Sequence, residues 1–265
     1  MIIDLSGRTA VVTGGSAGIG YAAVKLFLDA GANVAFCGRD KRKLSDVSIK
    51  LQKKYHKKKY FSLQCDVLNK AHVESFSKAV EDHFGGTDML INNAGQARLS
   101  TFSSTSDEEW RDELELKFFS IINTSRAFVP QLEKSDIAAI VCTSSLLARQ
   151  PEPHLLATSA ARAGQLALIH GMAQEFVKKS IRVNSVLIAQ VESDQWRKRF
   201  EALDDKDMTW EDYTKDIAIT SGVPLERMGK PEEAANAIFF LATPMSSFTT
   251  GSTVDVSGGL SRHVG

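Results

Sequence analysis

About seven short apolar runs alternate with longer amphipathic segments along the chain, and this alternation limits the possible folds more than any other feature of the sequence. The runs are rich in valine, isoleucine, leucine and alanine, and most of them do not alternate with polar residues. Such runs are typical of parallel strands that are buried on both faces of a sheet. The predicted strands are 9–12, 33–37, 60–65, 89–92, 138–143, 182–187 and 252–256.

Segments with helical periodicity separate these runs. The predicted helices include 20–30, 71–84, 108–132, 158–179 and 231–241. Gly31 is well placed to end the first of them, and Pro231 to begin the last. Repeated strand–helix–strand units imply an α/β fold with one doubly wound parallel sheet and right-handed crossovers. Because no linker rich in proline, glycine or serine divides the pattern, we expect residues 1–265 to form a single domain.

The composition limits the partners that the chain can have. The 265 residues include 32 basic and 32 acidic side chains, and a net charge of zero argues against nucleic acid as the main partner. No apolar run approaches the ~20 residues of a membrane span, and the N-terminal segment does not resemble a signal peptide. The three cysteines are too scattered for a disulfide framework or a zinc site, so we expect a cytoplasmic protein without a metal.

A long segment near the C-terminus, residues 192–222, breaks the alternation. It carries aromatic side chains among many charges. Insertions of this length in a compact domain are often functional. We therefore expect a helical flap over a substrate pocket, with a peripheral helical pair that only packs as the alternative.

The strongest local motif is the glycine-rich turn Thr13-Gly14-Gly15-Ser16-Ala17-Gly18-Ile19-Gly20, which lies between the first predicted strand and the first predicted helix. Gly14 permits the tight turn, Gly18 lets the backbone approach a diphosphate, and Gly20 lets the helix pack close to the strand. The free N–H groups and the dipole of the helix then face the anion. The turn therefore predicts a dinucleotide site.

This T-G-x-x-x-G-x-G pattern resembles the short-chain dehydrogenase/reductase family, and nearly the whole chain shares that resemblance. Cys65-Asp66-Val67, Asn92-Asn93-Ala94-Gly95 and Thr250-Gly251…Ser257-Gly258-Gly259 match other motifs of the family in the same order. The resemblance implies a Rossmann-like fold with Asp66 and Val67 at the adenine. The residues expected to bind the cofactor are Gly14, Ser16, Gly18, Ile19, Gly20, Arg39, Asp66, Val67, Asn93, Ala94 and Gly95.

The end of the second predicted strand, Cys37-Gly38-Arg39-Asp40, indicates which cofactor is bound. An acidic residue there would bind the ribose 2′-hydroxyl of NAD, whereas an arginine would accept the 2′-phosphate of NADP. Gly38 stands where the family's acid is usual, and the guanidinium of Arg39 suits a phosphate. We therefore expect NADP rather than NAD, although Asp40 could pair with Arg39 or reach the ribose itself.

The residues expected at the reacting centre depart from the family pattern. Members usually have a tyrosine that exchanges the proton, a lysine four residues later, a serine thirteen residues before the tyrosine, and an asparagine on the preceding long helix. At these four positions the sequence has Thr158, Arg162, Ser145 and Lys117. A threonine hydroxyl is a poor acid near neutral pH, and an arginine stays protonated. Lys117 and Arg162 can still supply positive charge to a developing alkoxide.

Three functions are compatible with this pattern. The leading hypothesis is an NADP(H)-dependent oxidoreductase that acts on a small carbonyl or alcohol substrate with an altered acid/base set. The second is an NADP-binding regulatory or interaction protein without turnover, and the third is a non-redox lyase or dehalogenase-like enzyme. His154, one turn before Thr158, is a candidate proton shuttle or a loop residue without a catalytic role. By resemblance we expect a homotetramer or homodimer joined through the helices 108–132 and 158–179.

Overall fold

The computed structural model describes residues 3–203 and 207–263, and its centre is one parallel sheet of seven strands. The strands follow the order β3-β2-β1-β4-β5-β6-β7. Their bounds are β1 Thr9–Thr13, β2 Asn33–Gly38, β3 Tyr60–Gln64, β4 Met89–Asn92, β5 Ala139–Ser145, β6 Arg182–Ile188 and β7 Thr253–Val256. The order reverses between β1 and β4, as in a Rossmann-like doubly wound fold, so the predicted fold class is confirmed.

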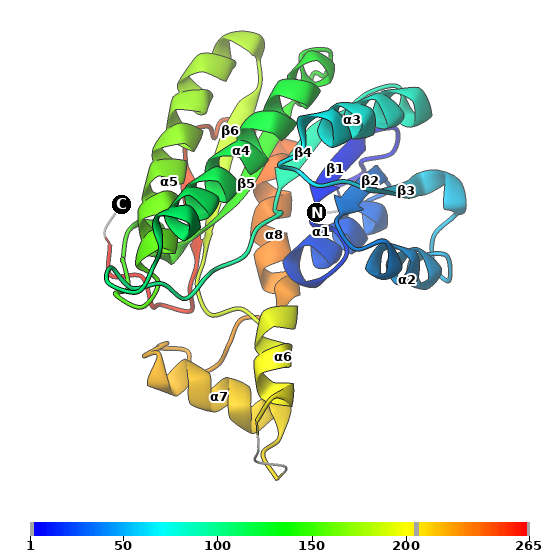
Figure 1. The fold of residues 1–265 in the computed structure, drawn as a ribbon. Helices are drawn as coiled ribbons and strands as arrows, with labels where there is room; N and C mark the ends of the chain where they lie inside the picture. The colour runs from blue at the N-terminus through cyan, green and yellow to red at the C-terminus, as the bar shows by residue number, and fades with distance from the viewer. Residues whose placement is uncertain (1–2, 204–206, 264–265) are drawn as a thin grey trace.

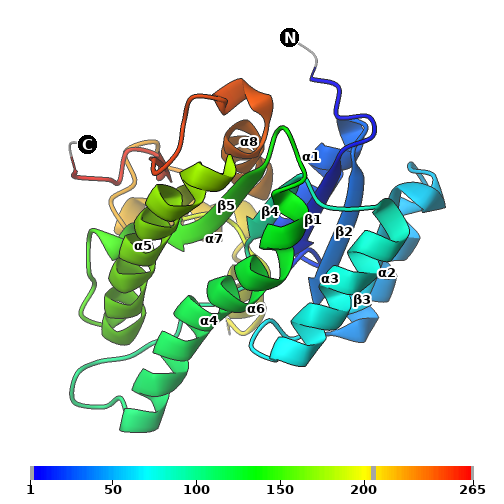
Figure 2. The same ribbon diagram turned by 90° about the horizontal axis from the view of Figure 1, so that it is seen from above.

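Helices cover both faces of the sheet (Figures 1 and 2). One apolar layer is formed by α1 (Gly18–Asp29), α2 (Lys41–Leu51) and α8 (Pro231–Ala242). The opposite layer is formed by α3 (Lys70–Phe84), α4 (Asp107–Leu132) and α5 (Leu156–Phe176). Short 3-10 turns lie at η1 Lys57–Lys59, η2 Leu146–Ala148, η3 Val177–Lys179 and η4 Pro244–Ser246. The sheet is thus buried on both faces, which explains its continuous apolar strands.

The helix ends follow the expected local signals. Gly31 adopts a φ of 86° directly after the C-cap of α1, and Pro231 is the first residue of α8. The sequence pattern did not single out α2. Its start is fixed by Asp40, whose carboxylate accepts hydrogen bonds from the backbone N–H groups of Arg42 and Lys43.

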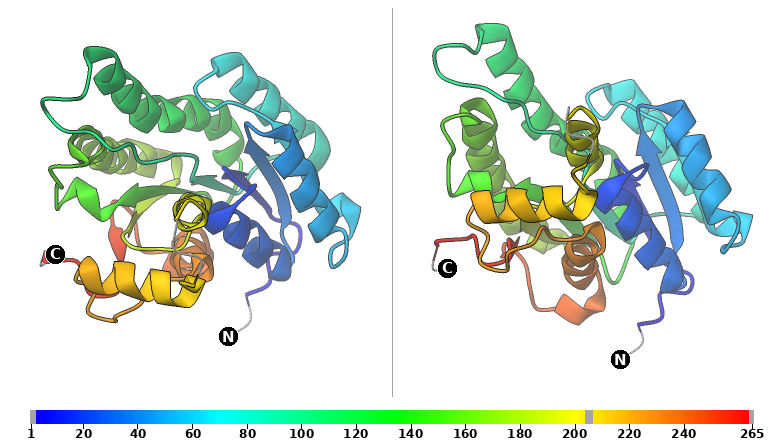
Figure 3. Two further views of the ribbon diagram at one scale, coloured as in Figure 1. Left: turned by 60° about the horizontal axis from the view of Figure 1, so that its bottom comes forward. Right: turned by 90° about the horizontal axis from the view of Figure 1, so that it is seen from below.

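The segment 192–222 contains two helices, α6 (Asp194–Glu201) and α7 (Trp210–Thr220), and residues 204–206 lie outside the described part. Both helices extend beyond the edge at which the strands end (Figures 1 and 3). The rings of Phe200, Trp210 and Tyr213 pack against one another, with centroids 5.4–5.9 Å apart. This aromatic cluster joins α6 to α7, so the segment is helical, as expected.

The described helices do not include one that is long and apolar enough to cross a bilayer. Cys37, Cys65 and Cys142 are buried free thiols, as the apolar runs around them indicate. Burial raises the pKa of the Cys142 thiol to about 12, so this side chain packs as a small apolar residue at neutral pH.

Candidate functional site

The turn between β1 and α1 leaves an open surface at the start of the helix. Gly14 and Gly18 have φ angles of 68° and 52°, which L side chains rarely adopt. A Cβ on Gly20 would lie 2.2 Å from the carbonyl oxygen of Gly14, so the helix reaches the strand only without a side chain there. A Cβ on Gly18 would meet no atom within 4 Å, and no side chain caps the N-terminus of α1. The first N–H groups of α1 are therefore available to an anion.

The loop after β4 is fixed against this turn. The backbone N–H groups of Asn93 and Ala94 both donate to Thr13 Oγ1, each at 3.0 Å. Asn93 Nδ2 donates to the carbonyl oxygens of Thr13 (3.1 Å) and Gly14 (3.3 Å). The structure thus brings the predicted residues Asn93, Ala94 and Gly14 together, and it gives the Asn93 amide a structural role in the turn.

Arg39 lies at the end of β2 with its side chain exposed. Within residues 3–203 and 207–263 its guanidinium makes no hydrogen bond or ion pair. Asp40 Oδ1 instead accepts from the N–H groups of Arg42 at 2.8 Å and Lys43 at 3.2 Å. The possible pairing of Asp40 with Arg39 is therefore wrong for this structure. A Cβ on Gly38 would lie 3.1 Å from Ser16 Oγ, which places Ser16 beside Arg39 at the strand end.

The segment expected at the adenine follows β3. Asp66 Oδ1 accepts a hydrogen bond from the N–H of Leu68 at 3.0 Å. The carbonyl oxygen of the buried Val67 accepts from Asn123 Nδ2, also at 3.0 Å, so α4 holds this segment in place. Both residues lie at the same edge of the sheet as Arg39, because parallel strands end on one side.

A buried polar cluster lies between α4 and α5. Lys117 and Thr158 are 1% exposed and Glu113 is 2% exposed. Lys117 Nζ donates to Glu113 Oε2 at 2.5 Å and to the carbonyl oxygen of Gln96 at 2.8 Å. Thr158 Oγ1 donates to Glu113 Oε1 at 2.9 Å and accepts from the N–H of Arg98 at 3.2 Å. The carboxylate of Glu113 thus joins two of the predicted site residues.

Arg162 lies next to this cluster. Its Nη1 donates to the carbonyl oxygen of Thr143 at 3.0 Å and to Gln165 Oε1 at 2.8 Å. Its Nε is buried and has no partner among the described residues, and a Cβ on Gly95 would lie 3.6 Å from its Nη2. A guanidinium with a free buried N–H beside the loop after β4 is a binding group for an oxygen-rich ligand.

The protein environment lowers the pKa of both Lys117 and Arg162. Burial and the nearby charge of Arg162 lower the pKa of Lys117 to about 8, although Glu113 opposes this change. Burial lowers the pKa of Arg162 to about 10. Two cations with one carboxylate leave a net positive charge at the ends of β4 and β5, which favours a negatively charged oxygen there.

Ser145 is the last residue of β5. Its hydroxyl oxygen accepts from the N–H of Leu147 at 3.2 Å. Among the residues with described positions, no acceptor binds the Ser145 hydroxyl proton, which leaves it able to donate. His154 lies in an exposed turn and its ring has no hydrogen bond or ion pair in the described ranges, so the structure gives no support to a proton shuttle there.

Sequence reasoning missed Glu113 and Gln165. Glu113 precedes Lys117 by four residues on one helix, a spacing that places both side chains on the same face. Their burial could not be read from this spacing, because such pairs are usually solvated. Gln165 Oε1 accepts from Ser144 Oγ, and its Nε2 donates to the carbonyl oxygen of Lys117. Lys117 is therefore enclosed between the helices and does not lie on a solvated helix face.

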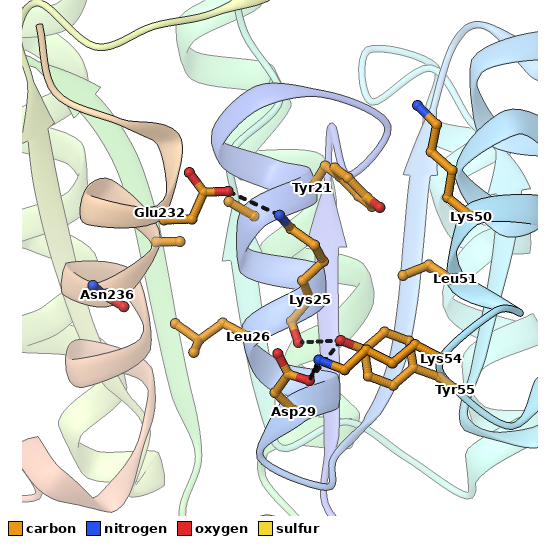
Figure 4. A pocket seen from close by; sticks show the side chains of 12 residues that line it. Tyr21, Lys25, Leu26, Asp29, Lys50, Leu51, Lys54, Tyr55, Glu232 and Asn236 are labelled. Atoms are coloured by element: carbon orange, nitrogen blue, oxygen red, sulfur yellow. Dashed lines mark hydrogen bonds and ion pairs between the residues drawn. The ribbon is translucent and has the colours of Figure 1, made fainter.

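Two hollows of the surface lie away from these groups. One, of about 340 Å³, lies between α1, α2 and α8 (Figure 4). Four of its charged side chains form two ion pairs: Lys25 with Glu232 at 2.9 Å, and Lys54 with Asp29 at 2.5 Å. The other, of about 500 Å³, runs along α5 and β7 and includes His170. Neither is lined by the glycine turn or by the Lys117–Glu113–Thr158 cluster.

Comparisons with known proteins find a family model and relatives that match nearly the whole chain. The family model described as enoyl-(acyl carrier protein) reductase matches residues 14–261. An uncharacterised short-chain type dehydrogenase/reductase of Sinorhizobium fredii is 33% identical, covering 98% of this chain and 99% of its own. A 3-oxoacyl-(acyl-carrier-protein) reductase of Vibrio cholerae is 31% identical, covering 97% and 99%.

Solved structures are similar over the whole chain. A short chain oxidoreductase of Pseudomonas aeruginosa PAO1, described as containing an atypical catalytic centre, is 54% identical. Its apo structure superposes with a TM-score of 0.96 over 98% of this chain and 100% of that one. Its NADPH-bound structure gives a TM-score of 0.94 over 99% and 100%. An L-sorbose reductase of Gluconobacter frateurii complexed with NADPH and L-sorbose is 28% identical, with a TM-score of 0.93 over both whole chains.

Proposed function

Because the chain belongs to the short-chain dehydrogenase/reductase family, we propose that it is an NADP(H)-dependent oxidoreductase that interconverts a carbonyl compound and an alcohol. The observation that carries this proposal is the open glycine turn beside the end of β2, where the guanidinium of Arg39 has no partner among the described residues. Relatives described as bound to NADPH support the same cofactor.

The residues present fit a dinucleotide phosphate. The free N–H groups of α1 and the open space at Gly18 would hold the diphosphate, and Arg39 with Ser16 would hold the 2′-phosphate. Ile19, Gly20 and the Asp66–Val67 segment would complete the adenosine side. The Nε of Arg162, which has no partner in the described part of the chain, would bind the ribose beside Gly95. When bound, a reduced nicotinamide supplies the hydride.

The chain's own polar groups would handle the substrate oxygen. Ser145 can donate its free hydroxyl proton to a carbonyl oxygen. Lys117 and Arg162 stabilise the negative charge that grows on this oxygen, because both are cations in a site with little solvent. Thr158 is not suited to donate a proton, since its own is bound to Glu113 and its oxygen accepts from Arg98. We therefore assign Thr158 to the support of Glu113.

The helices α6 and α7 form the proposed flap over this site. Gln195 Nε2 donates to the carbonyl oxygen of Ala97 at 3.3 Å, and Asp194 pairs with Lys43 of α2. These two contacts join the flap to both the loop after β4 and the first turn of α2. A small-molecule substrate would enter beneath it. The family resemblance further suggests a homotetramer or homodimer packed through α4 and α5, which light scattering of the purified protein would test.

The experiment is NADPH oxidation with a panel of ketones, aldehydes and keto sugars. We expect at least one substrate to be reduced. We expect Lys117→Met to lower kcat by about 10²–10⁴ while leaving NADPH affinity unchanged. The second candidate, an NADP-binding protein without turnover, is favoured by the engaged hydroxyl of Thr158. It would be supported if NADPH bound tightly and no carbonyl compound were reduced.

A further inference from the structure

Glu113 is a carboxylate buried between α4 and α5, where an ionised group is stable only if other groups bind it. Its two carboxylate oxygens have different partners: Oε2 accepts from Lys117 Nζ, and Oε1 accepts from Thr158 Oγ1. Both partners are themselves buried. An ionised carboxylate is expensive to enclose unless it is paired and hydrogen-bonded, and here both conditions are met.

The charges around Lys117 come from three elements. Glu113 faces it from α4, Arg162 from α5, and Arg98 from the loop after β4. Arg98 is itself near Glu109 and Asp112, at 3.7 Å and 3.6 Å. Glu113 is the carboxylate in direct contact with the lysine, and without it Lys117 would face two cations from a buried position.

We propose that Glu113 is a positioning residue that keeps Lys117 protonated and in place, so that Lys117 delivers the proton of the reduction. The inference rests on the proposed function. In the step, the carbonyl carbon gains the hydride that bound NADPH would supply, which would leave NADP+, while one N–H bond of the Lys117 ammonium breaks and an O–H bond forms on the carbonyl oxygen. Lys117 is left as a neutral amine, and it regains a proton from water.

The direct test is the titration of the Lys117 side chain by NMR of ¹³C- and ¹⁵N-labelled lysine, without cofactor or substrate. The Lys117 signal is assigned by its loss in Lys117→Met. In Glu113→Gln the pKa of Lys117 should fall by about 1 to 3 pH units, because the opposite charge is removed. Glu113→Asp keeps the negative charge, so the pKa of Lys117 should fall less in this variant than in Glu113→Gln. Glu115→Gln, an exposed position on the same helix, is the matched control and should change nothing.

The kinetic test uses the pH profile of kcat for NADPH-dependent reduction. Protonated Lys117 is required, so wild-type kcat should fall as the pH rises through about 8. Glu113→Gln should move this fall to lower pH, whereas a merely structural role would lower kcat equally at all pH values. An unchanged Lys117 pKa in folded Glu113→Gln would overturn the inference. If wild type reduces no substrate, the proposed function fails, and the NMR titration still decides whether Glu113 controls Lys117.

Discussion

Lys117 is a cation enclosed by protein, and its enclosure makes its proton easier to transfer. An exposed lysine holds its proton until far above neutral pH. Burial and the charge of Arg162 lower the pKa of Lys117 to about 8, close to the range in which a general acid is most effective. In the usual family pattern this position is an asparagine, and the proton comes from a tyrosine at the position of Thr158 in α5. We propose that the proton source of this chain is on α4 instead.

This enclosure should appear in the stability of the protein. The pKa of Lys117 is lowered from 10.5 to about 8 in the folded state, so the unfolded chain binds the proton more tightly between these values. The unfolding free energy should therefore rise with pH across this window, by roughly 3 kcal/mol from this group. Urea unfolding of wild type and Lys117→Met at pH 7.5 and 10 measures the difference. Equal pH slopes in the two proteins would contradict the lowered pKa.

Thr158 offers a second test at the residue scale. If Thr158 supports Glu113, Thr158→Val should lower kcat by less than about tenfold while it destabilises the protein by about 1–3 kcal/mol, because Glu113 Oε1 loses its donor. Thr158→Ser keeps the hydroxyl and is the matched control. If Thr158 were the general acid, Thr158→Val would instead cost about 10²–10⁴ in kcat. Steady-state kinetics together with thermal unfolding separate the two roles.

At the scale of elements, the contact between β1 and α1 decides whether the glycine turn exists. A Cβ on Gly20 would lie 2.2 Å from Gly14 O, whereas a Cβ on Gly171 in α5 would meet nothing within 4 Å. Gly20→Ala should therefore displace α1 and weaken NADPH binding strongly. Gly171→Ala should raise stability by up to about 1 kcal/mol through helix propensity. If Gly20→Ala bound NADPH as wild type does, the proposed geometry of the turn would be incorrect.

At the scale of the whole molecule, the sequence predicted the sheet well because parallel strands buried on both faces must be continuously apolar. The predicted strands differ from the observed ones by at most two residues at either end, and Gly31 and Pro231 mark the helix ends as expected. The helix α2 was not singled out, because its sequence is dominated by charges and its apolar face is narrow.

The candidate site was less predictable, because its key contacts join distant segments. The four residues named for the reacting centre could be located by their spacing, but not by their partners. The role of Glu113 depends on the packing of α4 against α5, and the role of Asp40 depends on where α2 begins. Neither the burial of a charged pair nor the direction of a carboxylate follows from residue spacing alone.

The central claim is that the end of β2 selects NADP through Arg39. The most direct measurement is calorimetric titration of wild type and Arg39→Ala with NADPH and NADH, with Arg111→Ala, an exposed arginine on α4, as the control. Wild type should bind NADPH more tightly than NADH. Arg39→Ala should weaken NADPH binding by about 10- to 100-fold, the loss of one or two charge-assisted hydrogen bonds, and leave NADH binding unchanged. Equal affinity of wild type for the two cofactors, or NADPH binding that does not depend on Arg39, would contradict the account.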